Sequence, residues 1–433
     1  MTDILNRIRA AFPPEGLFAD KEWILSPEPL RISAELGEQL EKLGYRLNLF
    51  NRACNELYHR SVAGKQPAWI ADYLDRGKPP VLVEFSRRKE FRQEVPRVIR
   101  PDLVLTEEGF TIAEIDSVPG GIGLTGWLNE TYAGLGFDVV GGAAGMVDGF
   151  RAILGDAAEI LVSQEAATYR PEMEWLARKT EGRLKVKSAE NYTPPTAGKP
   201  ATLYRFFELF DLPNIPGIQP TLDAAGRNAV HVTPPIKPYL EEKMWFALFW
   251  LRPLREFWRR ELSERHFLEL QKHIPYTWLL DPQPIPHHAV IPGLEINDWS
   301  ELAGFGQKHR ELILKISGFH ETAWGSRSVV LGSDMPQTDW RASVEKALGD
   351  FSHHPHILQR FHKSRVLEHP YFDLGNGSVQ TMRGRVRLCP YYFVIDGKAE
   401  LRGALATICP PDKKLLHGMK DAILVPTMVQ LAV

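Results

Sequence analysis

Hydrophobic residues recur at three- and four-residue spacing over residues 30–62, which is the pattern of a helix with one buried face. Residues 1 to about 75 are therefore predicted to be mainly helical. The next segment, PPVLVEFSRR (79–88), carries consecutive β-branched and apolar residues and is predicted to form a strand.

Short apolar runs alternate with helical patterns between residues 126 and 212. Strands are predicted at 137–142 (FDVVGG), 158–163 (AEILVS), 183–188 (RLKVKS) and within 201–212, and helices at 126–136, 145–155 and 165–182. This alternation favours an open α/β layer.

The second half of the chain follows a different pattern. Residues 233–258 predict a proline-rich turn followed by one long apolar helix, and residues 273–288 predict a loop between subdomains. Strands are predicted at 311–316, 328–332 and 356–364, and a helix at 340–351. Residues 383–408 predict a hairpin that turns at Asp396-Gly397.

Two strand-like runs, RPDLVLT (100–106) and FTIAEID (110–116), are joined by Glu107-Glu108-Gly109. A three-residue connection ending in glycine is typical of a hairpin loop. If Thr106 pairs with Phe110, three pairs face each other: Asp102 with Glu114, Arg100 with Asp116, and Val104 with Ile112. Leu103, Leu105, Ala113 and Ile115 then form the opposite, apolar face.

Arg100, Asp102, Glu114 and Asp116 lie on one face of this predicted hairpin. Because like charges opposite each other destabilise a sheet, a cation is expected over Asp102 and Glu114. Arg100 can neutralise part of the charge, and oxygen-only ligands suit Mg²⁺. A solvated surface face with ordinary acids is the other interpretation of the same pattern.

Lys315 lies on a predicted strand that leads into a loop with Gly318, Gly325, Ser326 and Ser328, and then into another strand. Loop amides and a lysine can bind phosphate oxygens, so this outline is typical of a phosphate-covering hairpin. An ordinary surface hairpin would have the same outline.

Composition narrows the function classes. The 433 residues suggest two or three domains, and the 44% hydrophobic and 24% charged residues are ordinary for a soluble protein. A net charge of −2 disfavours nucleic-acid binding, and no apolar run of about 18 residues predicts a membrane span. Three scattered cysteines and the absence of a signal-peptide pattern favour a cytoplasmic location.

Taken together, these segments resemble an ATP-grasp ligase. The acid motif precedes the lysine and loop, which resembles the circularly permuted ATP-grasp enzymes typified by the synthetase domain of glutathionylspermidine synthase. The matching segments are Arg100-x-Asp102, Glu114-x-Asp116, LEEKMWFALFW (240–250), Lys315 with its loop, HILQRF (356–361) and FVIDGKAELRG (393–403). Two features depart from the pattern: Asp116 replaces the usual Asn, and the loop is longer and poorer in glycine.

The resemblance implies a mixed α+β and α/β fold of the permuted ATP-grasp, glutathione-synthetase-like type. The implied regions are a mainly helical 1–95, an α/β region 96–235 with the acidic hairpin and a substrate-binding subdomain, and a nucleotide-binding region 236–433.

The resemblance also implies a set of site residues for ATP and Mg²⁺. Asp102, Glu114 and Asp116 would hold the metal. Lys243, Lys315, Gly318, Gly325 and Ser326 would bind phosphates, and Gln359 and Phe361 would flank adenine. Arg100 and Arg402 are candidates for the reacting phosphoryl group, although Arg100 could instead only pair with Asp116, and Arg402 could be structural. Ser117 and Asn129 could touch substrate or simply cap a turn and a helix.

The implied activity joins a small-molecule carboxylate to an amine or amino acid through an acyl phosphate, releasing ADP and phosphate. Two alternatives remain open: a kinase that stops after phosphorylation, and a degenerate ATP-grasp protein that binds or scaffolds without catalysis. Nothing in the sequence identifies the acid, the amine or the oligomeric state.

Overall fold

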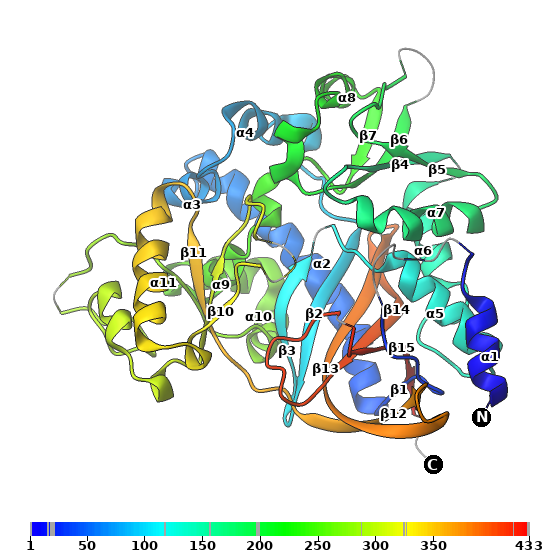
Figure 1. The fold of residues 1–433 in the computed structure, drawn as a ribbon. Coiled ribbons are helices and arrows are strands. Elements are labelled where there is room, and N and C mark those ends of the chain that lie inside the picture. The colour runs from blue at the N-terminus through cyan, green and yellow to red at the C-terminus, as the bar shows by residue number, and fades with distance from the viewer. Residues whose placement is uncertain are drawn as a thin grey trace. The chain divides into compact units, whose positions relative to one another are not determined.

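The computed structural model describes residues 2–14, 17, 22–116, 118–155, 157–195, 200–286, 288–323, 325, 327–418 and 420–430 (Figure 1). The chain forms two compact units: unit 1 comprises residues 1–51, 94–236 and 363–433, and unit 2 comprises residues 52–93 and 237–362. The predicted regions 1–95, 96–235 and 236–433 stay predictions.

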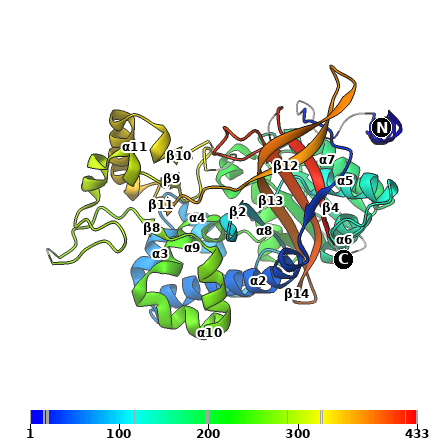
Figure 2. The same cartoon turned by 90° about the horizontal axis from the view of Figure 1, so that it is seen from below.

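Unit 1 contains a seven-stranded sheet built from distant parts of the chain. Its order is β1-β15-β14-β13-β2-β3, with β12 pairing β13, and only β1 and β15 run parallel. The strands are β1 (Leu30–Ile32), β2 (Val98–Thr106), β3 (Gly109–Asp116), β12 (Val366–Asp373), β13 (Ser378–Ile395), β14 (Lys398–Cys409) and β15 (Ile423–Val429). Figure 2 shows β12 running alongside the first part of β13.

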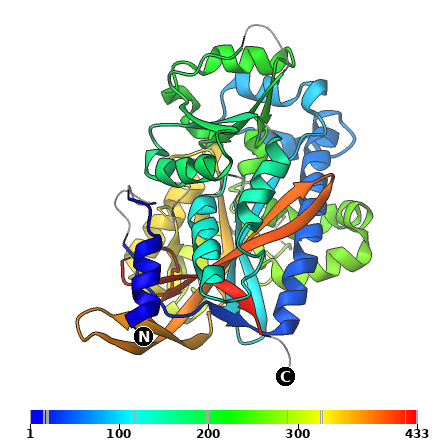
Figure 3. The same ribbon diagram turned by 90° about the vertical axis from the view of Figure 1, so that its right-hand side faces the viewer.

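Helices cover both faces of this sheet because its strands carry large side chains on each side. Helices α5 (Ile122–Gly134) and α6 (Gly145–Leu154) lie over one face (Figure 3), where the Phe393 ring lies near Phe150. On the other face Tyr392 donates a hydrogen bond to the Leu40 carbonyl of α2 (Ala34–Val62) over 2.7 Å. Helix α1 (Thr2–Ala11) precedes this layer in the chain.

A second sheet of unit 1 is entirely parallel. Its order is β5-β4-β6-β7, formed by β4 (Ala158–Val162), β5 (Leu184–Ser188), β6 (Ala201–Phe206) and β7 (Val230–Thr233). Helices α7 (Arg170–Lys179) and α8 (Ile218–Gly226) connect its strands. The predicted α/β alternation is thus confirmed, except that residues 137–142 form no strand and only Val139 makes an isolated bridge, to Met428.

Unit 2 contains a four-stranded antiparallel sheet of order β10-β9-β11-β8. Its strands are β8 (Thr277–Leu279), β9 (Leu312–Ile316), β10 (Val330–Leu331) and β11 (His356–Arg360), and its helices are α3 (Ala68–Leu74), α4 (Pro80–Ser86), α9 (Met244–Trp250), α10 (Arg255–His273) and α11 (Gln337–Gly349). Trp340 of α11 is fully buried against this sheet and donates to the Leu302 carbonyl over 2.7 Å.

Short 3-10 helices connect these elements in both units. They are η1 (Lys89–Phe91), η2 (Ala167–Tyr169), η3 (Leu209–Asn214), η4 (Pro238–Glu241), η5 (Arg252–Leu254), η6 (Trp299–Gly304), η7 (Gln307–His309), η8 (Gly332–Asp334) and η9 (Asp350–Ser352).

Three predictions for unit 2 were wrong. Residues 79–88 form a helix rather than a strand, because Pro80 at the first helical position is compatible with helix and Leu82 and Phe85 are buried one turn apart. The long helix predicted after the proline-rich turn within 233–258 is divided into α9 and α10 around Pro253, which cannot continue a helix. The predicted loop at 273–288 contains β8.

No helix in the described part of the chain combines the length and the apolar composition needed to cross a membrane.

Candidate functional site

The acidic hairpin forms with the predicted charge pairs. Asp102 faces Glu114 and Arg100 faces Asp116 across β2 and β3, as expected. The predicted partner of Val104 was wrong: Val104 faces Thr111, because Thr106 pairs with Gly109 and the connection is one residue shorter than expected. A bulge at Ala113 restores the register before the charged residues.

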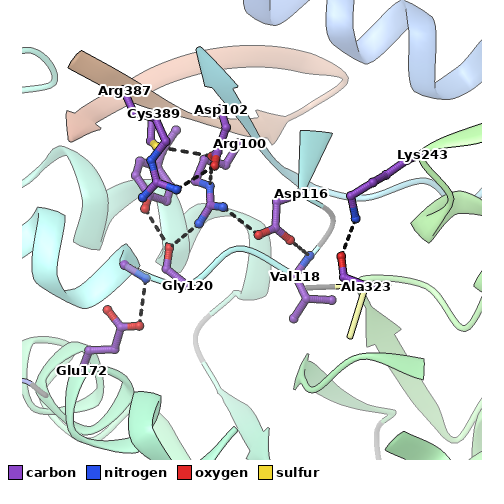
Figure 4. Close-up of polar contacts among 12 residues, drawn as sticks. Arg100, Asp102, Asp116, Val118, Gly120, Glu172, Lys243, Ala323, Arg387 and Cys389 are labelled. Carbon is purple, nitrogen blue, oxygen red and sulfur yellow. Dashed lines mark hydrogen bonds and ion pairs between the residues drawn. The ribbon is translucent and has the colours of Figure 1, made fainter. Parts of the chain in front are cut away.

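Asp102 lies inside unit 1, held by groups from two strands (Figure 4). Its residue is 3% exposed, and its Oδ1 and Oδ2 atoms lie 3.0 Å from Arg100 Nε and 3.0 Å from Arg387 Nη1. Burial opposes ionisation of Asp102, but the positive charges of Arg100 and Arg387 outweigh it and hold its pKa below the usual value. Cys389 Sγ donates to Oδ1 over 3.3 Å, and burial together with the Asp102 charge raises the pKa of this thiol to about 12.

Arg100 connects Asp102 to the rest of the hairpin. Its Nη2 donates to Asp116 Oδ2 over 2.8 Å and its Nη1 donates to the Gly120 carbonyl over 3.0 Å. Its side chain is only 12% exposed, and each of its three nitrogens faces a protein oxygen. The pairing with Asp116, one of the two predicted roles, is therefore present. A direct contact with a phosphoryl group stays a prediction.

Negative charge is crowded around Asp116. Its Oδ1 accepts from the Val118 amide over 3.0 Å, and its side chain is 24% exposed. Burial raises the pKa of Asp116, Arg100 lowers it, and the charges of Glu114 and Asp102 raise it again, so that the net shift is upward. Placing a cation near Glu114 and Asp116 would relieve this repulsion.

The segment after the hairpin is fixed by groups that sequence reasoning did not assign. The Gly120 carbonyl accepts from Tyr391 Oη over 2.7 Å as well as from Arg100. The fully buried Glu172, labelled in Figure 4, has a carboxylate that accepts from the Gly121 amide over 2.9 Å. It also accepts from the Leu124 amide over 3.1 Å, at the start of α5. Gly121 has a φ of +81°, which favours glycine.

The expected three-carboxylate metal site fits these residues only in part. Within the described residues, no group of three or more His, Cys, Asp or Glu side chains is placed to hold a metal ion. Asp102 directs both oxygens at arginine and cysteine side chains. Glu114 and Asp116 alternate with Ile115 on β3 and are both partly exposed, and one or two carboxylates are enough for Mg²⁺ that keeps waters or binds phosphates.

The predicted phosphate lysine Lys315 lies on β9 of unit 2 and is 4% exposed. Its Nζ donates to Gln359 Oε1 on β11 over 3.1 Å, and Gln359 Nε2 donates to Thr277 Oγ1 on β8 over 3.3 Å. Lys315 and Gln359, predicted separately for phosphate and adenine, are therefore brought together across the sheet. Phe361 lies just beyond β11, where its amide donates to the Glu311 carbonyl over 3.0 Å.

Lys243 contacts the same loop that follows Lys315. It is the residue before α9, and its Nζ donates to the Ala323 carbonyl over 2.7 Å (Figure 4). Gly318 begins this loop, and Gly325, with a φ of +64°, lies further along it. The predicted residues Ser117 and Ser326 lie outside the described residues.

Arg402 and Asn129 have local partners within unit 1. Arg402 occupies the bulge between β13 and β14 and forms an ion pair with Glu400, whereas Arg387 of β13 contacts Asp102. Asn129 is fully buried, and its amide donates to the Val140 and Gly142 carbonyls over 3.0 and 3.1 Å.

Comparison with known proteins gives a structural likeness alone. No family model matches the chain, and no curated protein matches it either. The structure of a glutathione synthetase-like effector from Globodera pallida, in its apo form, matches 99% of this chain and 96% of its own chain, with a TM-score of 0.55 and 11% identity. A suggested γ-glutamylcysteine synthetase from Methylobacillus flagellatus matches 88% of this chain and 84% of its own at 14% identity, but its TM-score of 0.40 carries no argument. The chain thus has a mixed α/β fold of the glutathione-synthetase-like type.

Proposed function

We propose that this chain is an ATP-dependent carboxylate–amine ligase. A substrate carboxylate oxygen attacks the γ-phosphorus of ATP and ADP leaves. An amine then displaces phosphate from the acyl phosphate to form an amide. The observation that carries this proposal is the buried Lys315 on the antiparallel sheet of unit 2, hydrogen-bonded to Gln359 and followed by the loop that Lys243 also contacts. The glutathione-synthetase-like fold supports it.

The two lysines would supply positive charge to the phosphates. Lys315 keeps a defined direction because Gln359 accepts from its Nζ, and Lys243 is fixed by the Ala323 carbonyl. Charge held in place in this way needs no reorganisation when phosphoryl transfer develops negative charge on the oxygens. Gln359 and Phe361 would border the adenine.

Glu114 and Asp116 would hold Mg²⁺, which, when bound, neutralises phosphate charge as a Lewis acid. Asp102 would orient Asp116 indirectly, because Asp102 binds Arg100 and Arg100 donates to Asp116. No step is assigned to Arg402, whose guanidinium pairs with Glu400.

The order of these parts along the chain, with the acidic hairpin before the lysines, supports a permuted ATP-grasp arrangement similar to the synthetase domain of glutathionylspermidine synthase. Region 96–235 would bind the carboxylate and the amine, and region 236–433 the nucleotide. A close contact within region 96–235 supports its role as the substrate-binding region. Gly120, just after the hairpin, packs so closely on the Tyr169 ring, next to the parallel sheet, that a Cβ on Gly120 would lie 2.5 Å from the ring.

Calorimetric titration of ATP with and without Mg²⁺ tests the nucleotide part of the proposal. Tighter binding with Mg²⁺ is expected. Incubation with ATP, Mg²⁺, hydroxylamine and a panel of carboxylic acids tests the chemistry, because hydroxylamine converts an acyl phosphate into a hydroxamate whatever the natural amine is. Hydroxamate and ADP in equal amounts are expected for at least one acid. Absence of ATP binding would refute the proposal.

A binding protein without catalysis is the second candidate, favoured by the engagement of both Asp102 oxygens with arginines. It predicts ATP binding that is equal with and without Mg²⁺, and no ADP release with any acid. A kinase would instead yield a stable phosphorylated product and no hydroxamate.

A further inference from the structure

Unit 2 contains a buried ion pair that adjoins Lys243 in the sequence and is hydrogen-bonded to the segment that holds Lys315. Lys78 Nζ lies 2.5 Å from Glu242 Oε1, and the two side chains are 1% and 3% exposed. Lys78 belongs to the turn between α3 and α4, and Glu242 immediately precedes Lys243. Because burying two charges costs solvation that their attraction only partly repays, such a pair is a poor device for stability alone. Its position calls for another explanation.

The second oxygen of Glu242 connects the pair to the strand of Lys315. Ser317, which follows β9 and is fully buried, donates its hydroxyl hydrogen to Glu242 Oε2. The same hydroxyl accepts from the Met244 amide over 2.8 Å. The Ser317 carbonyl accepts from the Lys243 amide over 2.7 Å. Three hydrogen bonds therefore join Ser317 to the consecutive residues 242–244.

The contact between Ser317 and residues 242–244, called the junction below, is close in sequence to both lysines. Lys243 is the neighbour of Glu242, and Lys315 is two residues before Ser317 on β9. Any shift of one segment against the other would change the separation of the two ammonium groups. The junction therefore determines the spacing at which they can meet phosphate oxygens.

The loop that follows β9, the candidate phosphate-binding loop, begins at Gly318 and also packs on the ion pair. A Cβ at Gly318 would lie 2.9 Å from the Glu242 carboxylate, so only glycine fits there without displacing the pair. The next residue, Phe319, has its ring 5.5 Å from Lys78 Nζ. The pair thus supports the loop as well as the two lysine segments.

We propose that Glu242 is a positioning residue for nucleotide binding and that Lys78 balances its charge. Glu242, neutralised and oriented by Lys78, holds Ser317, and Ser317 sets the main-chain spacing of Lys243 and Lys315. This inference rests on the proposed function for its role in nucleotide binding, but the junction itself is a property of unit 2 and can be tested separately.

The test compares two double variants that remove both charges: Lys78→Met with Glu242→Gln, and Lys78→Met with Glu242→Leu. Glutamine keeps an oxygen that accepts from Ser317, whereas leucine does not. We expect the first variant to bind ATP within about threefold of wild type and the second to bind at least about tenfold more weakly, as the loss of one well-placed polar contact would give. The Lys272–Glu269 pair on α10, whose side chains are 64% and 29% exposed, supplies the control, and Lys272→Met with Glu269→Gln should leave ATP affinity unchanged.

Chemical labelling measures the junction without nucleotide. Limited acetylation with acetic anhydride, followed by mass spectrometry, gives the reactivity of Lys243 and Lys315 relative to the exposed Lys346. The leucine variant should change the relative reactivity of both lysines, and the glutamine variant should not. Ser317→Ala, a smaller change, should have the same effect as the leucine variant and serves if that variant does not fold.

The outcomes separate the two proposals. If wild type binds no ATP, the proposed function fails, while altered labelling in the leucine or Ser317→Ala variant still supports the junction. If ATP affinity and labelling both stay as in wild type in these variants, the positioning role is refuted. Equal loss of affinity in the glutamine and leucine variants also refutes it, because the charges and not the Ser317 contact would then matter.

Discussion

Arg387 donates a hydrogen bond to Asp102 over 3.0 Å although the two residues are 285 positions apart in the sequence. They meet because β13 pairs directly with β2 in the seven-stranded sheet. Arg100 approaches the same carboxylate from its own strand, so Asp102 balances two guanidinium groups. Asp102, which the sequence predicts as a metal ligand, therefore has a structural role in the hairpin and joins β2 to β13.

Replacing Asp102 should therefore destabilise the protein. Asp102→Asn removes the negative charge between Arg100 and Arg387, so that Arg387 loses this ion pair and Arg100 keeps only its pair with Asp116. Breaking a buried ion pair typically costs about 3–5 kcal/mol, and we expect the free energy of unfolding to fall by about 3 kcal/mol. Urea unfolding followed by circular dichroism measures it. Glu174→Gln, at a pair of side chains 32% and 46% exposed, is the control and should change stability by less than about 0.5 kcal/mol. An equally small effect of Asp102→Asn would contradict this assignment.

Glu114 and Asp102 face each other but should respond differently to Mg²⁺. We expect Glu114→Gln to reduce the ratio of ATP affinities with and without Mg²⁺ by at least about tenfold, because even indirect partners of metal ligands cost about 10–100-fold in metal affinity. Asp102→Asn should reduce this ratio less than Glu114→Gln does, since both Asp102 oxygens face protein groups and it reaches the proposed metal ligands only through Arg100. Calorimetry on folded samples of both variants measures the ratio. A loss of Mg²⁺ dependence in Asp102→Asn alone would restore Asp102 as a ligand.

The sequence was sufficient for the local part of this site. The alternation of side chains along two strands placed Asp102 opposite Glu114 and Arg100 opposite Asp116 without knowledge of the rest of the fold. Even within the hairpin, the sequence did not predict the bulge at Ala113, and the predicted pairing of Val104 was wrong. The charged pairs were still predicted correctly because the connection is one residue shorter than expected and the bulge adds one residue, so the two differences cancel.

Partners from distant segments could not be predicted. Arg387, Glu172 and Lys78 come from strands, helices and turns whose proximity depends on the tertiary fold, and a lone buried acid or lysine has no sequence signature. The misassigned segment at 79–88 has a related cause: its Val-Leu-Val run favours a strand, but the proline at the start and packing in unit 2 favour a helix.

Lys315 provides the test of the nucleotide site. Lys315→Met removes the ammonium group while preserving an apolar side chain of similar length. Hydrogen bonds to charged groups contribute about 1.5–3 kcal/mol, so the dissociation constant for ATP should rise roughly 10–100-fold. Calorimetry measures it, and Lys346→Met on the exposed face of α11 is the matched control with wild-type affinity expected. Unchanged ATP affinity in Lys315→Met would place the nucleotide elsewhere.

A buried imidazole in unit 1 should give the protein a specific sensitivity to acid. His369 of β12 is 3% exposed, and its Nε2 lies 3.0 Å from Ser26 Oγ. Burial lowers the pKa of His369 to about 4, with the charge of Glu28 opposing the shift and that of Arg31 adding to it. Its value in the unfolded chain is about 6.5, so the unfolded chain binds the extra proton first as pH falls.

Between pH 6.5 and about 4, His369 should therefore lower the free energy of unfolding by up to about 1.4 kcal/mol for each unit that the pH falls, whereas above pH 6.5 it has no such effect. His369→Gln keeps a polar side chain near Ser26 but binds no proton. Its stability should fall less steeply over this window than that of wild type. Urea unfolding at pH 7, 6, 5 and about 4.5 compares the slopes, with His417→Gln, at an exposed position, as the control that should follow wild type. Parallel slopes for His369→Gln and wild type would mean that His369 titrates alike in the folded and unfolded protein.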